Sequence, residues 1–256
     1  MNLNDVKAVI TGGVSGLGFA VAERFVASGG RVALLDVNED RAATAVAALG
    51  ADKARFFRLD VAREAETAEV IGQARDWMDG LNVAVNCAGI LGAGRVLGRE
   101  GPMPLETFAR TVQVNLVGSF NVAKAAANLM QDNEPNEDKE RGVVINTASV
   151  AAYEGQIGQA AYSASKSGIV GMTLPMAREF ARIGVRVMTI APGIFHTPMM
   201  DVMPEHLQQA LGESVPFPKR LGQPQEFAAL AEHIVANAYF NGSTLRLDGA
   251  IRLEPK

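Results

Sequence analysis

Three residues whose side chains could move a proton lie close together between residues 142 and 171. Ser149 follows residues 143–145, a short apolar run that predicts a buried strand. Tyr162 and Lys166 are four positions apart, which places them on one face of a helix, about one turn from each other. A hydroxyl, a phenol and an ammonium group at one place could remove a proton from an alcohol. The alternative is that Tyr162 and Lys166 form a solvated pair on a helix surface.

A glycine-rich segment near the start of the chain predicts a site for phosphate groups. Residues 11–18 read TGGVSGLG, between a predicted strand at 6–10 and a predicted helix at 19–27. Glycines allow a tight turn and a close approach of the backbone, and a helix N-terminus favours negative charge. A tight turn without a ligand is the alternative. Four glycines among residues 12–18 exceed what such a turn needs, so we favour phosphate binding.

An acidic residue follows the second predicted strand, residues 31–35. Asp36 stands about 20 residues after the glycine turn, where a carboxylate can accept hydrogen bonds from an adenosine ribose. A carboxylate there repels a 2′-phosphate, and the neutral Ser15 supplies no cation to hold one. Both features favour NAD over NADP. Arg41 is the nearby cation that could weaken this preference, and a solvated or helix-capping role is the alternative for Asp36.

The proposed chemistry depends on a base that titrates near the working pH. A secondary alcohol that loses a hydride to a nicotinamide must also lose its hydroxyl proton. A free tyrosine has a pKa of about 10, and a neighbouring ammonium lowers it by stabilising the phenolate. We therefore expect Lys166 to lower the pKa of Tyr162. Ser149 is expected to donate a hydrogen bond to the substrate oxygen, so Ser149 and Tyr162 are the predicted substrate contacts.

The alternation of apolar runs with helical patterns predicts the fold class. We expect a single α/β domain over residues 1–256, with a doubly wound parallel sheet of the Rossmann type and helices on both faces. The predicted strands cover residues 6–10, 31–35, 54–59, 81–85, 143–145, 185–190 and 244–247. The predicted helices cover residues 19–27, 38–49, 64–78, 105–130, the stretch around Tyr162 to residue 182, and 225–238.

Three further segments carry specific expectations. Residues 91–104 and 131–141 are predicted loops, the second of them solvated. The methionine- and leucine-rich residues 199–215, within a region of about 195–216, predict a helical flap over an apolar ligand, with core filling as the alternative. Asn115 lies in the long predicted helix, where a buried asparagine needs partners. It could instead bond to backbone and kink that helix.

Composition and charge limit the class of partner. The 256 residues carry a formal net charge of −4, so we expect a small-molecule substrate and no nucleic acid. No apolar run is long enough for a membrane span. The single cysteine, Cys87, excludes an internal disulfide and suits a reducing compartment, and with a strand beginning close to Met1 we expect a cytoplasmic protein. The three histidines are scattered, so no metal site is expected.

Several motifs in a fixed order resemble the short-chain dehydrogenase/reductase family along essentially the whole chain. They are TGGVSGLG at 11–18, DV at 60–61, NCAG at 86–89, Asn115, Ser149, YSASK at 162–166 and PGIFHT at 192–197. The phrases VAVNCAGI at 83–90 and RLDGAIR at 246–252 are similar to the 3-hydroxyacyl-CoA dehydrogenases of that family. This resemblance implies NAD as cofactor, interconversion of (S)-3-hydroxyacyl-CoA and 3-oxoacyl-CoA in fatty acid metabolism, and a homotetramer.

The resemblance also implies a set of site residues. The implied catalytic residues are Asn115, Ser149, Tyr162 and Lys166, with Asn115 anchoring a water that relays the proton. The implied cofactor contacts are Gly12, Ser15, Gly16, Leu17 and Gly18 at the phosphates, Asp36 at the adenosine ribose, Asp60 and Val61 at the adenine, Cys87, Ala88, Gly89, Tyr162 and Lys166 at the nicotinamide side, and Pro192, Phe195 and Thr197 at the carboxamide. In this subgroup Cys87 replaces the family's usual asparagine, so we interpret it as lining the cofactor, without a nucleophilic role.

The amino-acid sequence leaves several other functions open. The chain could be a dehydrogenase of steroids or other lipophilic alcohols, or a 3-oxoacyl reductase of the same family. It could also be a cofactor-binding scaffold without catalysis, although the complete Asn, Ser, Tyr and Lys set argues against this. A methyltransferase on a related sheet would not need the Tyr-x-x-x-Lys pattern. Arg95, Arg99, Lys219 and Arg220 are candidates to meet CoA phosphates, with solvated surface as the alternative.

Overall fold

A seven-stranded parallel sheet forms the centre of the computed structural model, which describes residues 1–99, 101–201 and 203–255. Its strand order is β3-β2-β1-β4-β7-β8-β9. The strands are β1 (Lys7–Thr11), β2 (Arg31–Asp36), β3 (Ala54–Arg58), β4 (Val83–Asn86), β7 (Gly142–Thr147), β8 (Val185–Pro192) and β9 (Thr244–Leu247). All six pairings between neighbouring strands are parallel, as the predicted fold class requires.

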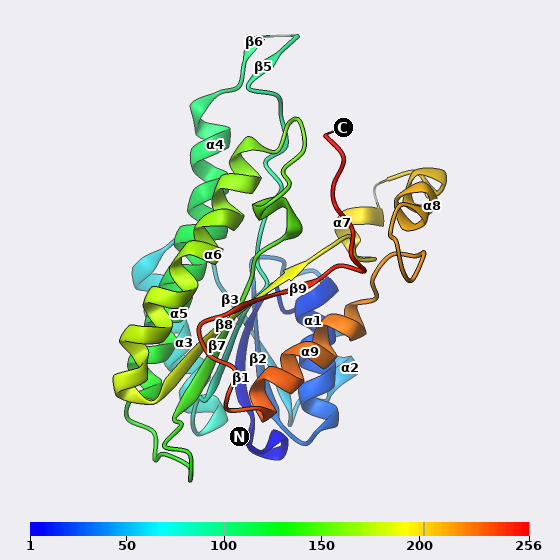
Figure 1. Ribbon diagram of the computed structural model, residues 1–256. Helices are drawn as coiled ribbons and strands as arrows, with labels where there is room; N and C mark the ends of the chain where they lie inside the picture. The colour runs from blue at the N-terminus through cyan, green and yellow to red at the C-terminus, as the bar shows by residue number, and fades with distance from the viewer. Residues whose placement is uncertain (100, 202, 256) are drawn as a thin grey trace.

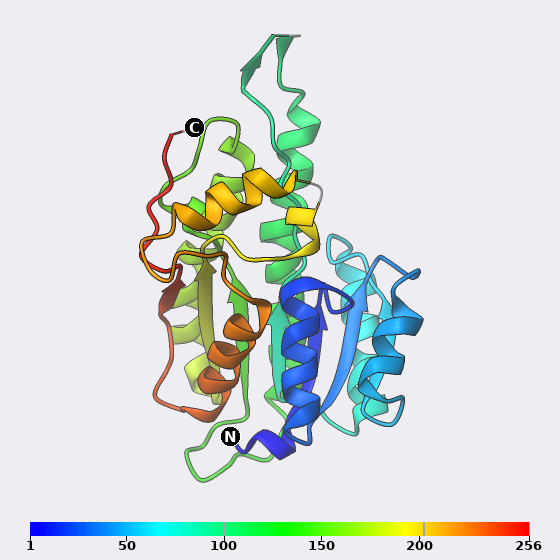
Figure 2. The ribbon, with the colours of Figure 1, turned by 90° about the vertical axis from the view of Figure 1, so that its right-hand side faces the viewer.

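Helices cover both faces of the sheet (Figure 1). One layer holds α1 (Gly16–Ala27), α2 (Ala42–Leu49) and α9 (Pro224–Ala236), and Figure 2 shows α1 and α9 side by side. The other layer holds α3 (Glu64–Met78), α4 (Leu105–Val112), α5 (Gly118–Met130) and α6 (Ala160–Phe180). The short α7 (Pro198–Asp201) and α8 (Glu205–Glu213) lie beyond the end of the sheet that is uppermost in Figure 1.

The two helix layers enclose two hydrophobic cores because successive strand residues point to opposite faces. In β1, Ile10 packs into the core that contains Phe25 of α1, whereas its neighbour Val9 packs into the core that contains Ile71 of α3. All four side chains are fully buried, with 0% exposure. Burial on both faces explains why the central strands are almost continuously apolar.

The strand order reverses beside β1, and this reversal determines where a ligand can bind. The chain runs from β1 outward to β2 and β3, and then returns to place β4 on the other side of β1. In a doubly wound sheet, a crevice opens at such a point outside the carboxyl ends of the strands. The glycine-rich segment follows β1 directly at that edge.

Four predicted segments differ from the structure. Helix α2 begins at Ala42 instead of residue 38, because the Asn38 side chain accepts a hydrogen bond from the Arg41 amide and forms a turn. The predicted helix over 105–130 contains a π-helical turn, Gln113–Val117. The predicted loop at 91–104 includes a small hairpin of β5 (Leu97–Gly98) and β6 (Gly101–Pro102), which projects at the top of Figure 1. The predicted flap helix is divided into α7 and α8, with Pro204 immediately before α8.

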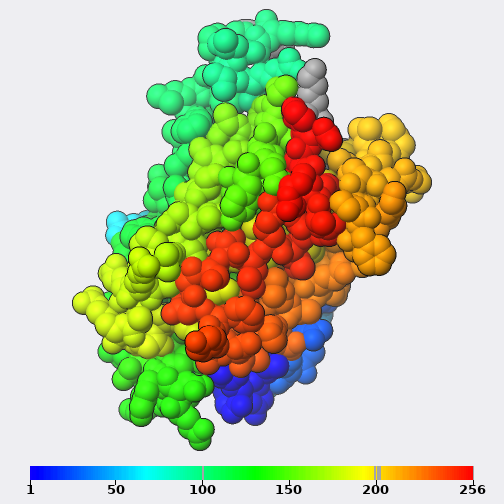
Figure 3. All heavy atoms as spheres, viewed as in Figure 1, coloured from blue at the N-terminus to red at the C-terminus, as the bar shows by residue number. Residues whose placement is uncertain are grey.

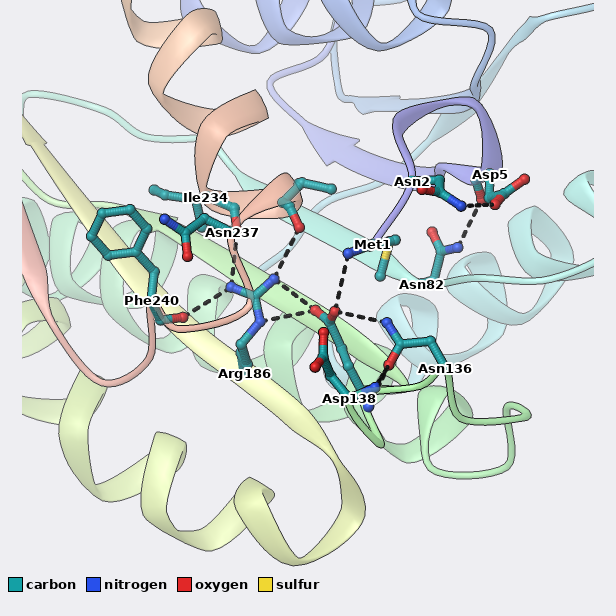
Figure 4. A network of polar contacts seen from close by, with 12 residues as sticks. Met1, Asn2, Asp5, Asn82, Asn136, Asp138, Arg186, Ile234, Asn237 and Phe240 are labelled. Atoms are coloured by element: carbon teal, nitrogen blue, oxygen red, sulfur yellow. Dashed lines mark hydrogen bonds and ion pairs between the residues drawn. The ribbon is translucent and has the colours of Figure 1, made fainter.

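The prediction that residues 131–141 form a solvated loop is wrong for Glu140, which is buried at 6% exposure. Its Oε1 accepts hydrogen bonds from Nε and Nη2 of Arg186 in β8, at 2.8 and 2.6 Å (Figure 4). The same guanidinium donates to the carbonyls of Ile234, Val235 and Phe240. Arg186 thus connects the start of β8 to Glu140 through a buried ion pair and to the end of α9 through the carbonyls, at the end of the sheet opposite the carboxyl ends of the strands.

Among the described residues, no helix is both long enough and apolar enough to cross a membrane.

Candidate active site

A cavity of about 750 Å³ opens at the carboxyl ends of β1, β2, β4, β7 and β8. Of the catalytic and cofactor-binding residues predicted from the sequence, all except Asn115 line it. They are Gly12, Ser15, Gly16, Leu17, Gly18, Asp36, Asp60, Val61, Cys87, Ala88, Gly89, Ser149, Tyr162, Lys166, Pro192, Phe195 and Thr197. The fold therefore brings residues from across the chain to one place.

The glycine-rich segment forms a close turn between β1 and α1. Gly12 and Gly16 have positive φ angles of +63° and +54°, a conformation that favours glycine. A Cβ atom on Gly18 would lie 2.4 Å from the Gly12 carbonyl oxygen, so only glycine allows the helix to pack this closely on the turn. Helix α1 begins at Gly16, which lines the cavity, and its N-terminus therefore faces the site where an anion would bind.

Asp36 is the last residue of β2 and lines the same cavity. Its Oδ1 accepts a hydrogen bond from the Asn38 amide at 3.0 Å, which holds the carboxylate at the strand end. Asp60 and Val61 follow β3 and line the cavity beside Asp36. The Asp36 carboxylate beside the apolar side chains of Val37 and Val61 suits a ribose with its attached base.

Thr11, to which the sequence analysis assigned no role, holds the end of β4 in place. Its Oγ1 accepts hydrogen bonds from the amides of Cys87 and Ala88, both at 3.1 Å. The Cys87 Sγ lies 3.5 Å from Oγ1 of Thr147, another residue that the sequence analysis did not single out. Burial raises the pKa of the Cys87 thiol to about 11, so the thiol stays protonated. This agrees with a lining role for Cys87.

Lys166 and Tyr162 converge on the same wall of the cavity. Lys166 is 5% exposed, and its Nζ donates to the Thr147 carbonyl at 2.7 Å and lies 5.7 Å from the centroid of the Tyr162 ring. Burial lowers the pKa of Lys166 to about 8. Burial also raises the pKa of Tyr162, an effect opposed by its hydrogen bond with Ser149. The expected lowering of the Tyr162 pKa by Lys166 is not found: the pKa is raised, because burial disfavours the charged phenolate.

Asn115 lies in the π-helical turn, behind the cavity wall. Its Oδ1 accepts from the Ile90 amide at 2.8 Å, and its Nδ2 donates to the Ile90 carbonyl at 2.9 Å and to Oγ of Ser165 at 3.0 Å. A Cβ atom on Gly89 would lie 3.2 Å from Asn115 Oδ1 and 3.7 Å from Lys166 Nζ. The Asn115 side chain therefore bonds to backbone, as the alternative prediction states, and its part in proton transfer stays a prediction.

The remaining lining residues are largely apolar. Met200, Met203 and Leu211 belong to residues 199–215, the segment that the methionine- and leucine-rich composition predicted as a flap over an apolar ligand. The others with no local signal include Ile90, Leu91, Gln156, Gln159 and Leu253. None of the four basic residues proposed for CoA phosphates is among the lining residues that the structure describes, whereas Arg110 is.

Comparison with known proteins identifies the family. The model of the short chain dehydrogenase family matches residues 6–208, most of the described fold. The chain belongs to the short-chain dehydrogenase family. The protein is therefore an oxidoreductase, and family membership implies a nicotinamide cofactor and a small-molecule substrate.

Several members of the short-chain dehydrogenase family are similar over their whole length. The 3-hydroxyacyl-CoA dehydrogenase type-2 of Bos taurus is 50% identical over 256 residues, covering 99% of this chain and 98% of that protein. The protein of the same name from Drosophila melanogaster is 45% identical over 255 residues, covering 99% of this chain and 100% of that protein. The crystal structure of 3-hydroxyacyl-CoA dehydrogenase type-2 from Mycobacterium avium has a TM-score of 0.91 at 39% identity, covering 98% and 97% of the two chains.

The cavity fits a dinucleotide cofactor by its own geometry. A cradle at Gly12 and Gly18, which a side chain would fill, lies at one helix N-terminus, and Asp36 and Lys166 line the same continuous cavity.

Residues 1–99, 101–201 and 203–255 contain no group of three or more His, Cys, Asp or Glu side chains that could hold a metal ion.

Proposed function

We propose that this protein is an NAD-dependent dehydrogenase that interconverts (S)-3-hydroxyacyl-CoA and 3-oxoacyl-CoA. The observation that carries the proposal is the convergence of Ser149, Tyr162 and Lys166 on the cavity that also holds the glycine turn. The identity of about half to 3-hydroxyacyl-CoA dehydrogenase type-2 along the whole chain supports the substrate class.

NAD is preferred over NADP in this proposal because of Asp36. Its carboxylate lies at the end of β2, where it would accept hydrogen bonds from the adenosine ribose and repel a 2′-phosphate. Arg41, the cation that could offset this repulsion, is exposed and is not among the lining residues within the described chain. The glycine turn and the N-terminus of α1 would hold the pyrophosphate.

Residues of this chain would accept the hydroxyl proton of the substrate and transfer it to solvent. A bound oxidised nicotinamide supplies a hydride acceptor for the alcohol carbon. Tyr162 would accept the hydroxyl proton at its phenolate oxygen, and Ser149 would donate a hydrogen bond to the substrate oxygen. Lys166, with three donors of which one goes to Thr147, would bind the nicotinamide ribose and stabilise the phenolate by its charge. Asn115 would position the adjoining wall and the water through which the proton leaves.

The apolar end of the cavity suits an acyl chain. Met200, Met203 and Leu211 line it from the segment of α7 and α8, which we propose as the substrate flap. Methionine adapts to chains of different length. Arg110 is the cation besides Lys166 among the described lining residues, so it replaces the four basic residues considered earlier as a candidate partner for CoA phosphates.

Resemblance supports the proposed assembly, and cysteine chemistry supports the proposed compartment. Similarity to the 3-hydroxyacyl-CoA dehydrogenases leads us to propose a homotetramer. Cys87 is a free thiol, which supports a reducing compartment, and we propose the cytoplasm.

The test is a substrate panel at fixed NAD concentration, with NADH formation followed by absorbance. It compares 3-hydroxyacyl-CoAs of several chain lengths with 3-hydroxybutyrate, hydroxysteroids and simple secondary alcohols. We expect the highest kcat/KM with the acyl-CoAs. If they were no better than simple alcohols, the substrate assignment would fail while the family assignment stood, and a preference for hydroxysteroids would support a dehydrogenase of lipophilic alcohols.

A further inference from the structure

One wall of the cavity comes from the end of the described chain. Leu253, in the segment that follows β9, lines the cavity together with Gln156 and Gln159. These glutamines belong to the stretch that connects Ser149 to Tyr162, so this wall adjoins the pair that would hold the reacting oxygen. In Figures 1 and 3 the red segment runs beside the green one.

Two hydrogen bonds, one between backbone groups and one from a side chain, join the two segments directly. The Ile157 amide donates to the Pro255 carbonyl at 3.0 Å, and Nε2 of Gln156 donates to the Glu254 carbonyl at 3.0 Å. Neither segment is part of a helix or strand at these contacts. Their placement must therefore come from side chains that anchor them to the sheet.

Arg246 of β9 supplies that anchor. Its Nη1 and Nη2 donate to the two carboxylate oxygens of Glu154 at 2.7 and 3.1 Å, a two-point contact of fixed geometry. Its Nε donates to Asp248 at 2.7 Å, and Nη2 also donates to the Ile251 carbonyl at 3.0 Å. One guanidinium thus contacts both segments that form the wall.

Arg246, Arg252, Glu154 and Asp248 form a cluster in which two positive charges pair with two negative charges. Three of its side chains are largely shielded from water. The side chains of Arg246 and Glu154 are each 23% exposed and that of Asp248 is 10% exposed. Arg252 adds contacts to both carboxylates at 3.3 Å. The Arg246 guanidinium holds the pKa of Glu154 below its usual value, so the carboxylate stays charged at neutral pH. Because β9 pairs with β8, Arg246 itself is held by the sheet opposite Ala191.

We propose that Arg246 is a positioning residue for substrate selection. By binding Glu154 and Asp248 at the same time, it holds Leu253 and residues 156–159 next to each other. These residues form one wall of the cavity, with an apolar side chain and two amide side chains, that would contact the acyl chain. The identity of the ligand as an acyl chain rests on the proposed function. The placement of the wall does not depend on it.

The test compares Arg246→Met, Arg246→Lys, Leu253→Ala and the Arg246→Met/Leu253→Ala double variant in the full chain. Arg24→Met is the matched control, because Arg24 also pairs with a carboxylate, Glu232 at 2.6 Å, but outside the lining of the cavity. Kinetics with short and long 3-hydroxyacyl-CoAs, NADH affinity by fluorescence, and hydrogen exchange at the Ile157 amide are measured for each.

We expect Arg246→Met and Leu253→Ala each to raise KM for long-chain substrates about tenfold, with kcat and NADH affinity close to wild type. The double variant should raise KM for long-chain substrates no further than Arg246→Met alone, because both changes disrupt the same wall. Arg246→Lys should recover part of the loss, and the Ile157 amide should exchange faster in Arg246→Met but not in Arg24→Met.

Additive effects in the double variant, or unchanged Ile157 exchange in Arg246→Met, would overturn the proposal. A loss of NADH affinity in parallel with KM would also overturn it, since that pattern indicates a general structural defect. If the wild type oxidised no acyl-CoA, the proposed function would fail, and the exchange at Ile157 would still decide the role of Arg246.

Discussion

The side-chain amide of Asn115 forms a closed pair of hydrogen bonds with the peptide group of Ile90, at 2.8 and 2.9 Å. This pair joins the π-helical turn to the segment after β4, and it supports the backbone at Gly89, which lines the cavity. A buried amide used in this way has a structural role that is separate from any part in proton transfer.

Asn115→Leu should therefore be strongly destabilising. The change leaves the buried N–H and C=O groups of Ile90 without partners, and we expect a loss of roughly 2–5 kcal/mol in the free energy of unfolding. Asn121→Leu is the control, since the Asn121 side chain is also buried and donates a hydrogen bond to the Val61 carbonyl at 3.1 Å. Urea unfolding of both variants measures the difference, and equal losses would contradict the special role of the Asn115–Ile90 pair.

Tyr162→Phe should separate catalysis from cofactor binding. Removal of the phenol oxygen eliminates the proposed proton acceptor, so turnover should fall by about 10²–10⁴-fold. NADH affinity, measured by fluorescence titration, should stay near the wild-type value. Tyr153→Phe is a suitable control because Tyr153 is 49% exposed. Turnover of Tyr162→Phe at the wild-type rate would refute the mechanism.

Lys166→Met should raise stability while abolishing activity. Burial lowers the pKa of Lys166 from 10.5 to about 8, so keeping it protonated at pH 7 costs the folded protein free energy. Without cofactor, the variant should be more stable than wild type by roughly 2 kcal/mol at pH 7, after allowing for the lost hydrogen bond to Thr147.

The sign of the pH dependence tests this explanation. Between pH 8 and 10.5 the unfolded chain binds more protons at Lys166 than the folded protein, so wild-type stability rises with pH. The advantage of Lys166→Met should therefore narrow by about 1 kcal/mol between pH 7 and pH 9. Urea unfolding at both values measures it, with the exposed Lys124→Met as a control for the loss of a lysine. A difference that is independent of pH would show that burial of the charge is not the cause.

Asp36→Ala should weaken the selection of NAD over NADP. Hydrogen bonds from a ribose diol to a carboxylate contribute enough to change the ratio of kcat/KM values by about 10–100-fold. Glu39→Ala is the control, because Glu39 is a nearby acid that pairs with Arg58 at 3.1 Å and lies outside the lining. A wild-type enzyme that preferred NADP would contradict the role given to Asp36.

Local sequence patterns predicted the parts of the site whose geometry depends on neighbouring residues. The spacing of Tyr162 and Lys166 determines their positions on one helix, and the glycines at 12, 16 and 18 determine a turn that a side chain would obstruct. The alternation of strands and helices similarly predicted a doubly wound parallel sheet. Helix boundaries were less well predicted where a polar side chain competed with the helix, as Asn38 does before α2.

The sequence by itself therefore determined the fold class, the glycine turn and the Tyr162–Lys166 pair, because short-range backbone geometry produces each of them. Only the tertiary structure decided that Asn115 binds the peptide of Ile90, that Glu140 is buried against Arg186, and that Leu253 lines the cavity. Arg246 and Glu154 are 92 positions apart, and they meet only because β9 adds to the sheet beside β8. Contacts of this kind depend on the order of strands in the sheet, which no local pattern of residues specifies.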